Sequence, residues 1–210
     1  MRFPCCNAAE EDEAGRMNGK RSESGGRAFA WMAVIVLAAV AALGLAAVWV
    51  GPLNQDEGWY LNAGLAAARG RIPYVDFAFT QGPVFPWVYG LTSALWSPFG
   101  VLGGRLATLL CGIAGSLLLA EVGARLAPER DRAAARLVGA SLVLLNLYQL
   151  YFLGVVKTYS LTLLWIACGL AALRGAAERN ASARAAVAGV FLALAAGTRL
   201  SSGILLAVCG

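Results

Sequence analysis

The apolar run AFAWMAVIVLAAVAALGLAAVWV, residues 28–50, decides the class of fold to which this chain belongs. It contains no charged residue, and as a helix it would measure about 34 Å, enough to cross a bilayer. The dipeptide Gly51-Pro52 follows and ends the helical pattern. We therefore predict a transmembrane helix over residues 28–50.

The composition of the whole chain agrees with a lipid environment. Of its 210 residues, 59% are hydrophobic and 14% are charged, whereas soluble domains average about 45–50% and about 25%. The net charge of +5 comes from basic residues that are scattered between apolar runs. They form no basic face with interleaved aromatic residues, so no nucleic-acid partner is expected. Positive loops beside membrane spans explain the charge better.

The residues before the first span are polar and charged. Residues 1–27 predict a disordered cytosolic tail, and the apolar run that follows is too long for a signal peptide. The five cysteines show no C-x-x-C spacing, and the chain has no histidine, which argues against a zinc site. We interpret those in apolar runs, Cys111, Cys168 and Cys209, as small hydrophobic side chains.

Four further apolar runs are predicted to span the membrane: 101–124, 137–156, 158–173 and 185–210. The segment PVFPWVYGLTSALWSPFG, residues 83–100, is apolar but short and rich in proline. If it lies in the interface rather than across the bilayer, all the basic clusters beside the spans are cytosolic, as the positive-inside rule requires. We adopt that arrangement, with Trp87, Tyr89 and Trp96 at the headgroup level.

The predicted fold is thus an all-α polytopic bundle with a cytosolic N-terminus. Its outer loop, residues 51–100, is too long for a plain connector and predicts a functional role. The chain stops at AVCG, residues 207–210, without a polar flank. That ending predicts the N-terminal fragment of a longer membrane protein.

Two adjacent carboxylates, Asp56 and Glu57, follow the first span at once. One interpretation is helix capping, because Asn54 and Glu57 have capping-box spacing, and Asp56 could also cap the helix itself. One acceptor suffices for a cap, however, and two carboxylates beside anionic headgroups are repelled. A carboxylate just outside the hydrocarbon is also placed to act as a base on a membrane-bound substrate. Both interpretations remain open.

The stretch after the acidic pair predicts a helix on the membrane surface. In GWYLNAGLAAARG, residues 58–70, Leu61, Leu65 and Ala68 recur at helical spacing, and Gly70 is expected at the C-terminal end. The next stretch, RIPYVDFAFTQGPVFPW, residues 71–87, adds a third acid, Asp76. A Gln-Gly-Pro break then precedes the segment expected as a second surface helix.

In order and spacing, these features resemble the N-terminal half of the polytopic GT-C glycosyltransferases, over about residues 28–210. The resemblance rests on the acidic pair, the R-x-P-Y-x-D-F segment at 71–77, the proline-bounded aromatic segment and the Thr-Arg of GTRLSSG at 197–203. The nearest type is family 39, the protein O-mannosyltransferases and the bacterial lipopolysaccharide-sugar and aminoarabinose transferases.

This resemblance implies a multi-pass enzyme of the bacterial plasma membrane and cell envelope. It would transfer a sugar, with inversion, from a polyprenyl-phosphate carrier to a lipid, glycan or protein acceptor on the outer face. Asp56 would be the base and Glu57 its catalytic neighbour. An attacking hydroxyl must lose a proton, and a leaving phosphate needs cations. The candidates for substrate binding are Arg199, Lys157, Arg105, Gln81 and Asp76.

Structural roles are an alternative explanation for the basic candidates. Snorkelling to the interface would explain Arg105 and Lys157, and an internal ion pair would explain Arg199. Glu121 and Arg125 are interpreted as a structural i,i+4 pair. A divalent cation would have only three carboxylates as ligands, Asp56, Glu57 and Asp76.

The chain departs from the resemblance at two places. Some relatives carry a lysine where this chain has Gln81-Gly82, and some carry a second acid where it reads VVKTYS, residues 155–160. A transporter or flippase subunit is the alternative function, and it predicts broken helices and internal repeats. A non-catalytic membrane scaffold is the third interpretation, and it would not need an acidic outer loop.

Overall fold

The computed structural model describes residues 31–175, 181–204 and 208. Apart from an isolated bridge between Pro73 and Phe77, the regular structure in these ranges is helical. Three helices are long and apolar enough to cross a membrane: Trp31–Val50, Ser93–Ala124 and Ala181–Thr198. The prediction of an all-α chain with apolar, span-length helices is therefore confirmed. The tail predicted at residues 1–27 lies outside the described residues.

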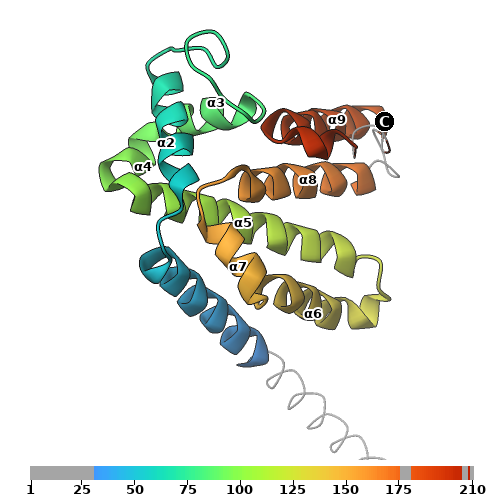
Figure 1. Cartoon of the computed structure of the whole chain (residues 1–210). Helices are drawn as coiled ribbons and strands as arrows, with labels where there is room; N and C mark the ends of the chain where they lie inside the picture. Colours follow the sequence, from blue (N-terminus) through green and yellow to red (C-terminus); the bar gives the residue numbers. More distant parts are fainter. Residues whose placement is uncertain (1–30, 176–180, 205–207, 209–210) are drawn as a thin grey trace, which may run out of the picture. The chain divides into compact units, whose positions relative to one another are not determined.

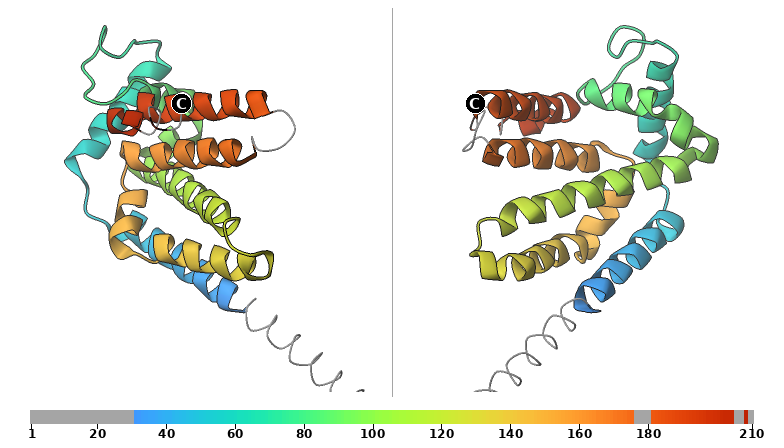
Figure 2. Two further views of the ribbon diagram at one scale, coloured as in Figure 1. Left: turned by 90° about the vertical axis from the view of Figure 1, so that its right-hand side faces the viewer. Right: turned by 180° about the vertical axis from the view of Figure 1, so that it is seen from behind.

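Two compact units divide the chain, residues 1–39 and 40–210, and the following description concerns the second. Its α-helices are α2 (Gln55–Ala68), α3 (Val84–Leu91), α4 (Ser93–Trp96), α5 (Gly100–Ala124), α6 (Arg132–Leu144), α7 (Leu147–Gly154), α8 (Thr158–Gly175) and α9 (Ala181–Thr198). Short 3-10 turns occur at Ser97–Phe99, Glu129–Asp131 and Leu200–Ser202. In Figure 1 and Figure 2, α9, α8, α5 and the α6–α7 pair lie side by side in that order.

Glycines let α5 lie close to α8. A Cβ added at Gly115 would come within 2.9 Å of the backbone nitrogen of Leu164 in α8, and one at Gly112 within 3.0 Å of the Ser160 hydroxyl oxygen in α8. Small residues allow this approach between membrane helices, where packing rather than water exclusion drives association. At the far end of α5, Glu121 and Arg125 form the predicted i,i+4 ion pair, with Nε and Oε1 2.8 Å apart.

Residues 51–100 supply most of the main hydrophobic core. The buried members of this core are Tyr60, Leu61, Ala63, Phe79, Phe85, Tyr89, Trp96, Val156 and Leu161. Segment 83–100 contains α3 and α4 and a 3-10 turn, and from Ser93 onward it forms part of the span-length helical stretch Ser93–Ala124. Tyr89 and Trp96 have buried side chains, and the Trp96 indole donates to the Tyr89 carbonyl at 2.9 Å.

The buried face of α2 also differs from the predicted one. Leu61 is buried, but Ala68 is exposed, and the helix instead buries its small residues against α3. A Cβ on Gly64 would come within 2.8 Å of the Tyr89 Cβ, so the glycine permits this contact. The helix ends at Ala68, and Gly70 adopts φ 80°, a left-handed conformation that glycine tolerates.

Two of the predicted spans are interrupted. The continuous span expected over 137–156 bends by 75° between α6 and α7, because the Asn146 side chain accepts the backbone N–H groups of Tyr148 and Gln149 and starts a new helix. The span expected over 185–210 stops at Thr198, after which Arg199 is extended, with φ −144° and ψ 114°. Helix α8 matches the span expected at 158–173, although its apolar part is shorter than the three span-length helices.

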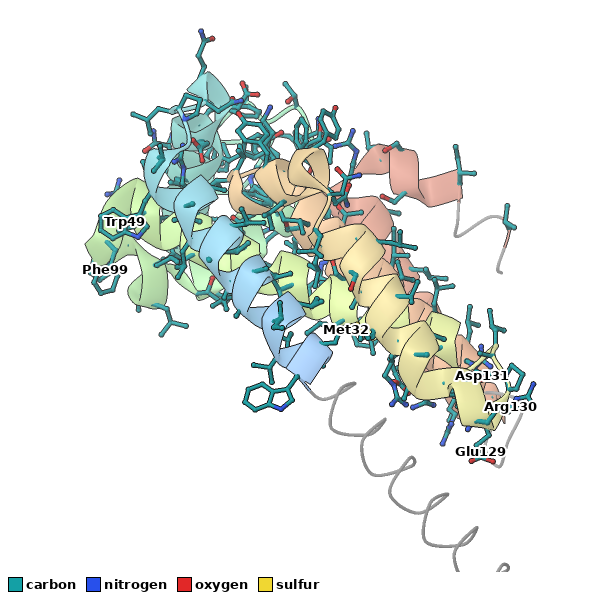
Figure 3. All side chains as sticks on the ribbon, turned by 90° about the horizontal axis from the view of Figure 1, so that it is seen from below. Met32, Trp49, Phe99, Glu129, Arg130 and Asp131 are labelled. Carbon is teal, nitrogen blue, oxygen red and sulfur yellow. The ribbon has the colours of Figure 1, made fainter. Side chains whose placement is uncertain are left out.

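The two ends of the second unit differ in chemistry. Figure 3 shows Trp49 and Phe99 projecting at one end, with Glu129, Arg130 and Asp131 at the other. Aromatic residues favour a membrane interface, and charged residues favour water. The residues of the acidic pair lie with α2, at the aromatic end.

Candidate functional site

A buried ion pair joins α2 to α5. The Nε and Nη2 atoms of Arg105 donate to Oε1 and Oε2 of Glu57 at 2.8 and 2.7 Å. The relative exposure of the two residues is 1% for Glu57 and 5% for Arg105. This two-bond geometry is the strong form of the arginine–carboxylate contact.

The remaining Arg105 donors hold the end of the first span. Nη1 donates to the carbonyls of Val48 and Gly51, and Nη2 donates to that of Pro52, each at 2.9 Å. A guanidinium has five N–H groups, and these bonds together with those to Glu57 engage all of them. Arg105 therefore does not snorkel, and it has no free donor for a phosphate.

Glu57 also bonds two backbone segments. Its carboxylate accepts the N–H of Asn54 at 3.0 Å, and Asn54 in turn accepts the N–H of Asp56, which confirms the predicted capping box. It also accepts the N–H of Val156 at 3.1 Å. Burial alone would raise the pKa of Glu57, but the hydrogen bonds from Arg105 and these backbone groups outweigh it and lower the pKa.

We call Glu57 and Arg105, with the backbone groups they bind, the clamp. It places the residues on either side of Glu57 and Val156, because Asp56 precedes Glu57 and Lys157 follows Val156. The sequence suggested Glu57 as a catalytic carboxylate and Arg105 as a phosphate contact. In the structure both side chains are buried, and their hydrogen-bonding groups are engaged by protein atoms.

The acid that remains accessible is Asp56, and its partner is Lys157. Their Oδ2 and Nζ atoms lie 2.8 Å apart, with the Asp56 side chain 54% exposed and that of Lys157 17% exposed. The hydrogen bond that Lys157 donates to Asp56 raises the pKa of Lys157 against the opposing effect of burial. Lys157 is thus a partly buried, charged lysine that faces a carboxylate open to an incoming group.

Arg199 contributes a second cation near this pair. Its guanidinium carbon lies 4.3 Å from the centre of the Tyr159 ring, and its Nε donates to Ser201 at 3.0 Å. Within the described ranges no carboxylate pairs with Arg199, so the internal ion pair that the sequence allowed is not formed there. Helix α9 ends at Thr198, and Arg199 follows it with an extended backbone.

Tyr60 connects the three charges electrostatically. Burial raises its pKa most, and the Asp56 charge raises it further, while Lys157 and Arg199 act in the opposite direction. Tyr159 acts on both Tyr60 and Lys157. Asp56 pairs with Lys157, and Arg199 lies over the ring of Tyr159, two residues after Lys157. We call these four residues, with Tyr60 one helical turn after Asp56, the charged cluster.

A pocket of about 320 Å³ adjoins this cluster between α7 and α8, with Arg199 at its edge. Its walls are formed by Tyr148, Gln149, Phe152, Leu153, Tyr159, Thr162, Leu163, Ile166 and Arg199. This volume is at the lower end of the range for small-molecule sites.

Asp76 and Gln81 belong to a separate turn. The Asp76 carboxylate accepts the N–H of Ile72 at 2.7 Å, and Arg71 donates to the Asp76 carbonyl at 2.7 Å. The Tyr74 hydroxyl donates to the Gln81 carbonyl. No contact among the described residues joins either residue to Asp56 or Lys157, so the structure does not bring these two candidates into the charged cluster.

The three acids do not assemble into a metal site. Glu57 is saturated by the clamp, and Asp76 closes the turn at Ile72. In the described part of the chain, no group of three or more His, Cys, Asp or Glu side chains is placed to hold an ion. The acidic residues of the described chain therefore do not fit a divalent cation.

Sequence reasoning missed Tyr60, Tyr159 and Thr162. Tyr60 follows Asp56 by four residues, and Tyr159 follows Lys157 by two. Residues four apart on a helix are neighbours, so helical spacing could have placed Tyr60 beside Asp56. Thr162 gave no signal, because a single threonine in an apolar helix resembles any small packing residue.

Comparison of the chain with protein-family models, curated protein sequences and solved structures found no match. The fold defines a class, an all-α protein with span-length apolar helices. A narrower identity depends on the chemistry of the charged cluster.

Proposed function

We propose that the protein is a membrane glycosyltransferase that uses a polyprenyl-phosphate sugar as donor and an acceptor hydroxyl at the outer membrane face. One observation carries this proposal: the accessible Asp56 carboxylate lies 2.8 Å from Lys157, and Arg199, without a carboxylate partner in the described chain, acts on the same cluster. A base beside two cations suits a reaction in which a hydroxyl loses a proton and a phosphate departs.

The reaction can be followed atom by atom. The acceptor hydroxyl gives its proton to Asp56 as its oxygen forms a bond to the anomeric carbon. The bond from that carbon to the phosphate oxygen breaks, and the phosphate keeps the electron pair. Lys157 and Arg199 stabilise the negative charge that develops on this oxygen. Attack from the side opposite the phosphate inverts the anomeric centre.

The ion pair gives Lys157 a double role. In the empty site its ammonium group pairs with the Asp56 carboxylate at 2.8 Å. An arriving phosphate competes for the same ammonium group. Movement of Lys157 toward the phosphate would leave the Asp56 carboxylate free to accept the proton of the acceptor hydroxyl.

The test is Asp56→Asn in the protein reconstituted into liposomes with polyprenyl-phosphate glycosides and lipid acceptors. Loss of a general base lowers rates by about 10²- to 10⁴-fold, so sugar transfer should fall by at least about a hundredfold. Asp131→Asn is the matched control, because Asp131 is an exposed acid at the opposite end of the second unit. Undiminished transfer by Asp56→Asn would refute the catalytic assignment.

A specific observation also favours the transport alternative. The α6–α7 pair is bent by 75°, and α9 stops at Thr198 before an extended Arg199. Broken helices form substrate sites in many transporters. In the same liposomes, a flippase would move the lipid-linked sugar between leaflets without forming a glycosylated acceptor, and the transferase would form that product.

A further inference from the structure

One residue that lines the pocket between α7 and α8 carries a hydroxyl group without a hydrogen-bond partner. Thr162 lines the pocket and has 6% relative exposure. Its Oγ1 is buried, and no protein group in the described residues bonds it. A buried hydroxyl without a partner costs about 1–3 kcal/mol, so a ligand that bonds it would gain affinity.

Thr162 differs in this respect from other helical hydroxyls in the chain. Five of them donate to the carbonyl four residues earlier: Thr92, Thr108, Ser116, Ser141 and Thr198. This local bond is the usual way to satisfy a hydroxyl inside an apolar helix. Thr162 makes no such bond to Thr158, although the same arrangement is open to it within α8.

The other pocket walls combine flat apolar faces with polar groups. Tyr148 and Phe152 have ring centres 4.8 Å apart, and Phe152 and Tyr159 5.3 Å apart. Gln149 also lines the pocket, and its side-chain amide can both donate and accept. Arg199 closes the edge with its guanidinium over Tyr159.

These features distinguish between the two parts of a lipid-linked sugar. With the phosphate at Arg199, either the isoprenoid chain or the sugar ring would enter the pocket. A hydrocarbon chain has no group that could bond the Thr162 hydroxyl, and it would leave that hydroxyl and the Gln149 amide desolvated. A sugar has hydroxyl groups for both and an apolar ring face for the aromatic walls.

We propose that the pocket between α7 and α8 binds the sugar ring of the donor, with Thr162 hydrogen-bonded to one of its hydroxyls. This inference rests on the proposed function, and it adds a specificity site beyond the charged cluster. Arg199, which lines the pocket, holds the phosphate, and the anomeric carbon lies between the pocket and the charged cluster. The isoprenoid chain extends away from the pocket into the lipid.

The experiment compares two probes that differ only in the sugar. They are a short-chain isoprenyl monophosphate and the same phosphate glycosylated with a single hexose or pentose. Binding of each to the detergent-solubilised chain is measured by thermophoresis for the wild type, Thr162→Val and Thr162→Ser. Thr92→Val is the matched control, because Thr92 lies outside this pocket and bonds its own helix.

The wild type should bind at least one glycosylated probe more tightly than the bare phosphate. Thr162→Val should reduce that preference by about five- to 150-fold, the factor that corresponds to one unpaired buried polar group. Thr162→Ser should keep most of the preference. The unfolding temperature of the empty Thr162→Val protein should not fall, because the lost hydroxyl bonds nothing there.

Each other outcome has a definite meaning. If Thr162→Val weakens both probes equally, or if no glycosylated probe binds better than the phosphate, the pocket does not hold the sugar, while the transferase proposal stands. A fall in the unfolding temperature would show that the hydroxyl has a structural role and would overturn the inference. If neither probe binds to any variant, the proposed donor class itself is refuted.

Discussion

Replacing Glu57 with glutamine tests whether the clamp stabilises the fold. Glutamine keeps the shape of the side chain, but its NH₂ group is a donor. It would stand opposite N–H donors of Arg105 or of the backbone, and the hydrogen bonds at that position would be lost. The guanidinium of Arg105, which has 5% relative exposure, would lose its charge partner. Breaking a buried ion pair from one side costs about 3–5 kcal/mol.

The expected loss is large enough to measure directly. For chains of about 150–250 residues, each 1 kcal/mol shifts the unfolding temperature by about 2–4 °C, so Glu57→Gln should lower it by about 6–20 °C in detergent. Arg105→Met should act similarly. The double variant Glu57→Met with Arg105→Met should lose about 1–3 kcal/mol less than the sum of the two single variants, because neither charge is then left unpaired.

Asp131→Asn supplies the comparison. Asp131 pairs with Arg130 at 3.3 Å, but both side chains are more than half exposed, and such pairs contribute about 0–1 kcal/mol. The assay is thermal unfolding followed by tryptophan fluorescence in one detergent for all variants. If Glu57→Gln unfolds within 2–4 °C of Asp131→Asn, or if the single variants are additive in the double variant, the clamp does not stabilise the fold as described.

Two further predictions concern the same framework. The pKa of Glu57 is lowered below its ordinary value of 4.5, so the stabilisation that its carboxylate provides is complete above pH 4.5 and is lost as the pH falls through the lowered pKa. Between pH 6 and pH 3, the unfolding temperature should therefore fall more steeply for the wild type than for Glu57→Gln. Equal slopes would contradict this prediction. Gly115→Ala should destabilise the protein by about 1–3 kcal/mol, because its Cβ would come within 2.9 Å of the α8 backbone. Gly123→Ala is the control and should stabilise the protein by about 0.5–1 kcal/mol, because no atom lies within 4 Å of its Cβ. Equal unfolding temperatures for the two variants would rule out close packing of α5 on α8.

Hydropathy predicted the helical class and the bounds of several helices, because an apolar run without charge has few alternatives in lipid. The run at 101–124 became α5, and the run at 158–173 became α8. The same measure missed the break at Asn146, where one polar side chain caps a new helix. A window average over about 20 residues hides such a residue, although asparagine is a strong N-cap.

The aromatic segment 83–100 shows a different limit of sequence reasoning. Tryptophan and tyrosine are favoured both at membrane interfaces and in buried cores where the polar atom finds a partner. Composition cannot separate these two environments. In the structure the Trp96 indole bonds the Tyr89 carbonyl, a contact between residues seven apart that follows from the turn joining α3 and α4.

The acidic pair shows why the site could be located from sequence but not resolved. Consecutive residues on an α-helix point about 100° apart, so Asp56 and Glu57 cannot both face the same neighbour. One must turn toward the bundle and meet Arg105, and the other must turn outward. Only the tertiary position of α5 decides which, and it selects Glu57 for the clamp and leaves Asp56 with Lys157. The capping and catalytic interpretations are therefore compatible. Glu57 closes the helix and bonds the backbone at Val156, and these bonds hold in place the Asp56–Lys157 pair for which we propose a catalytic role.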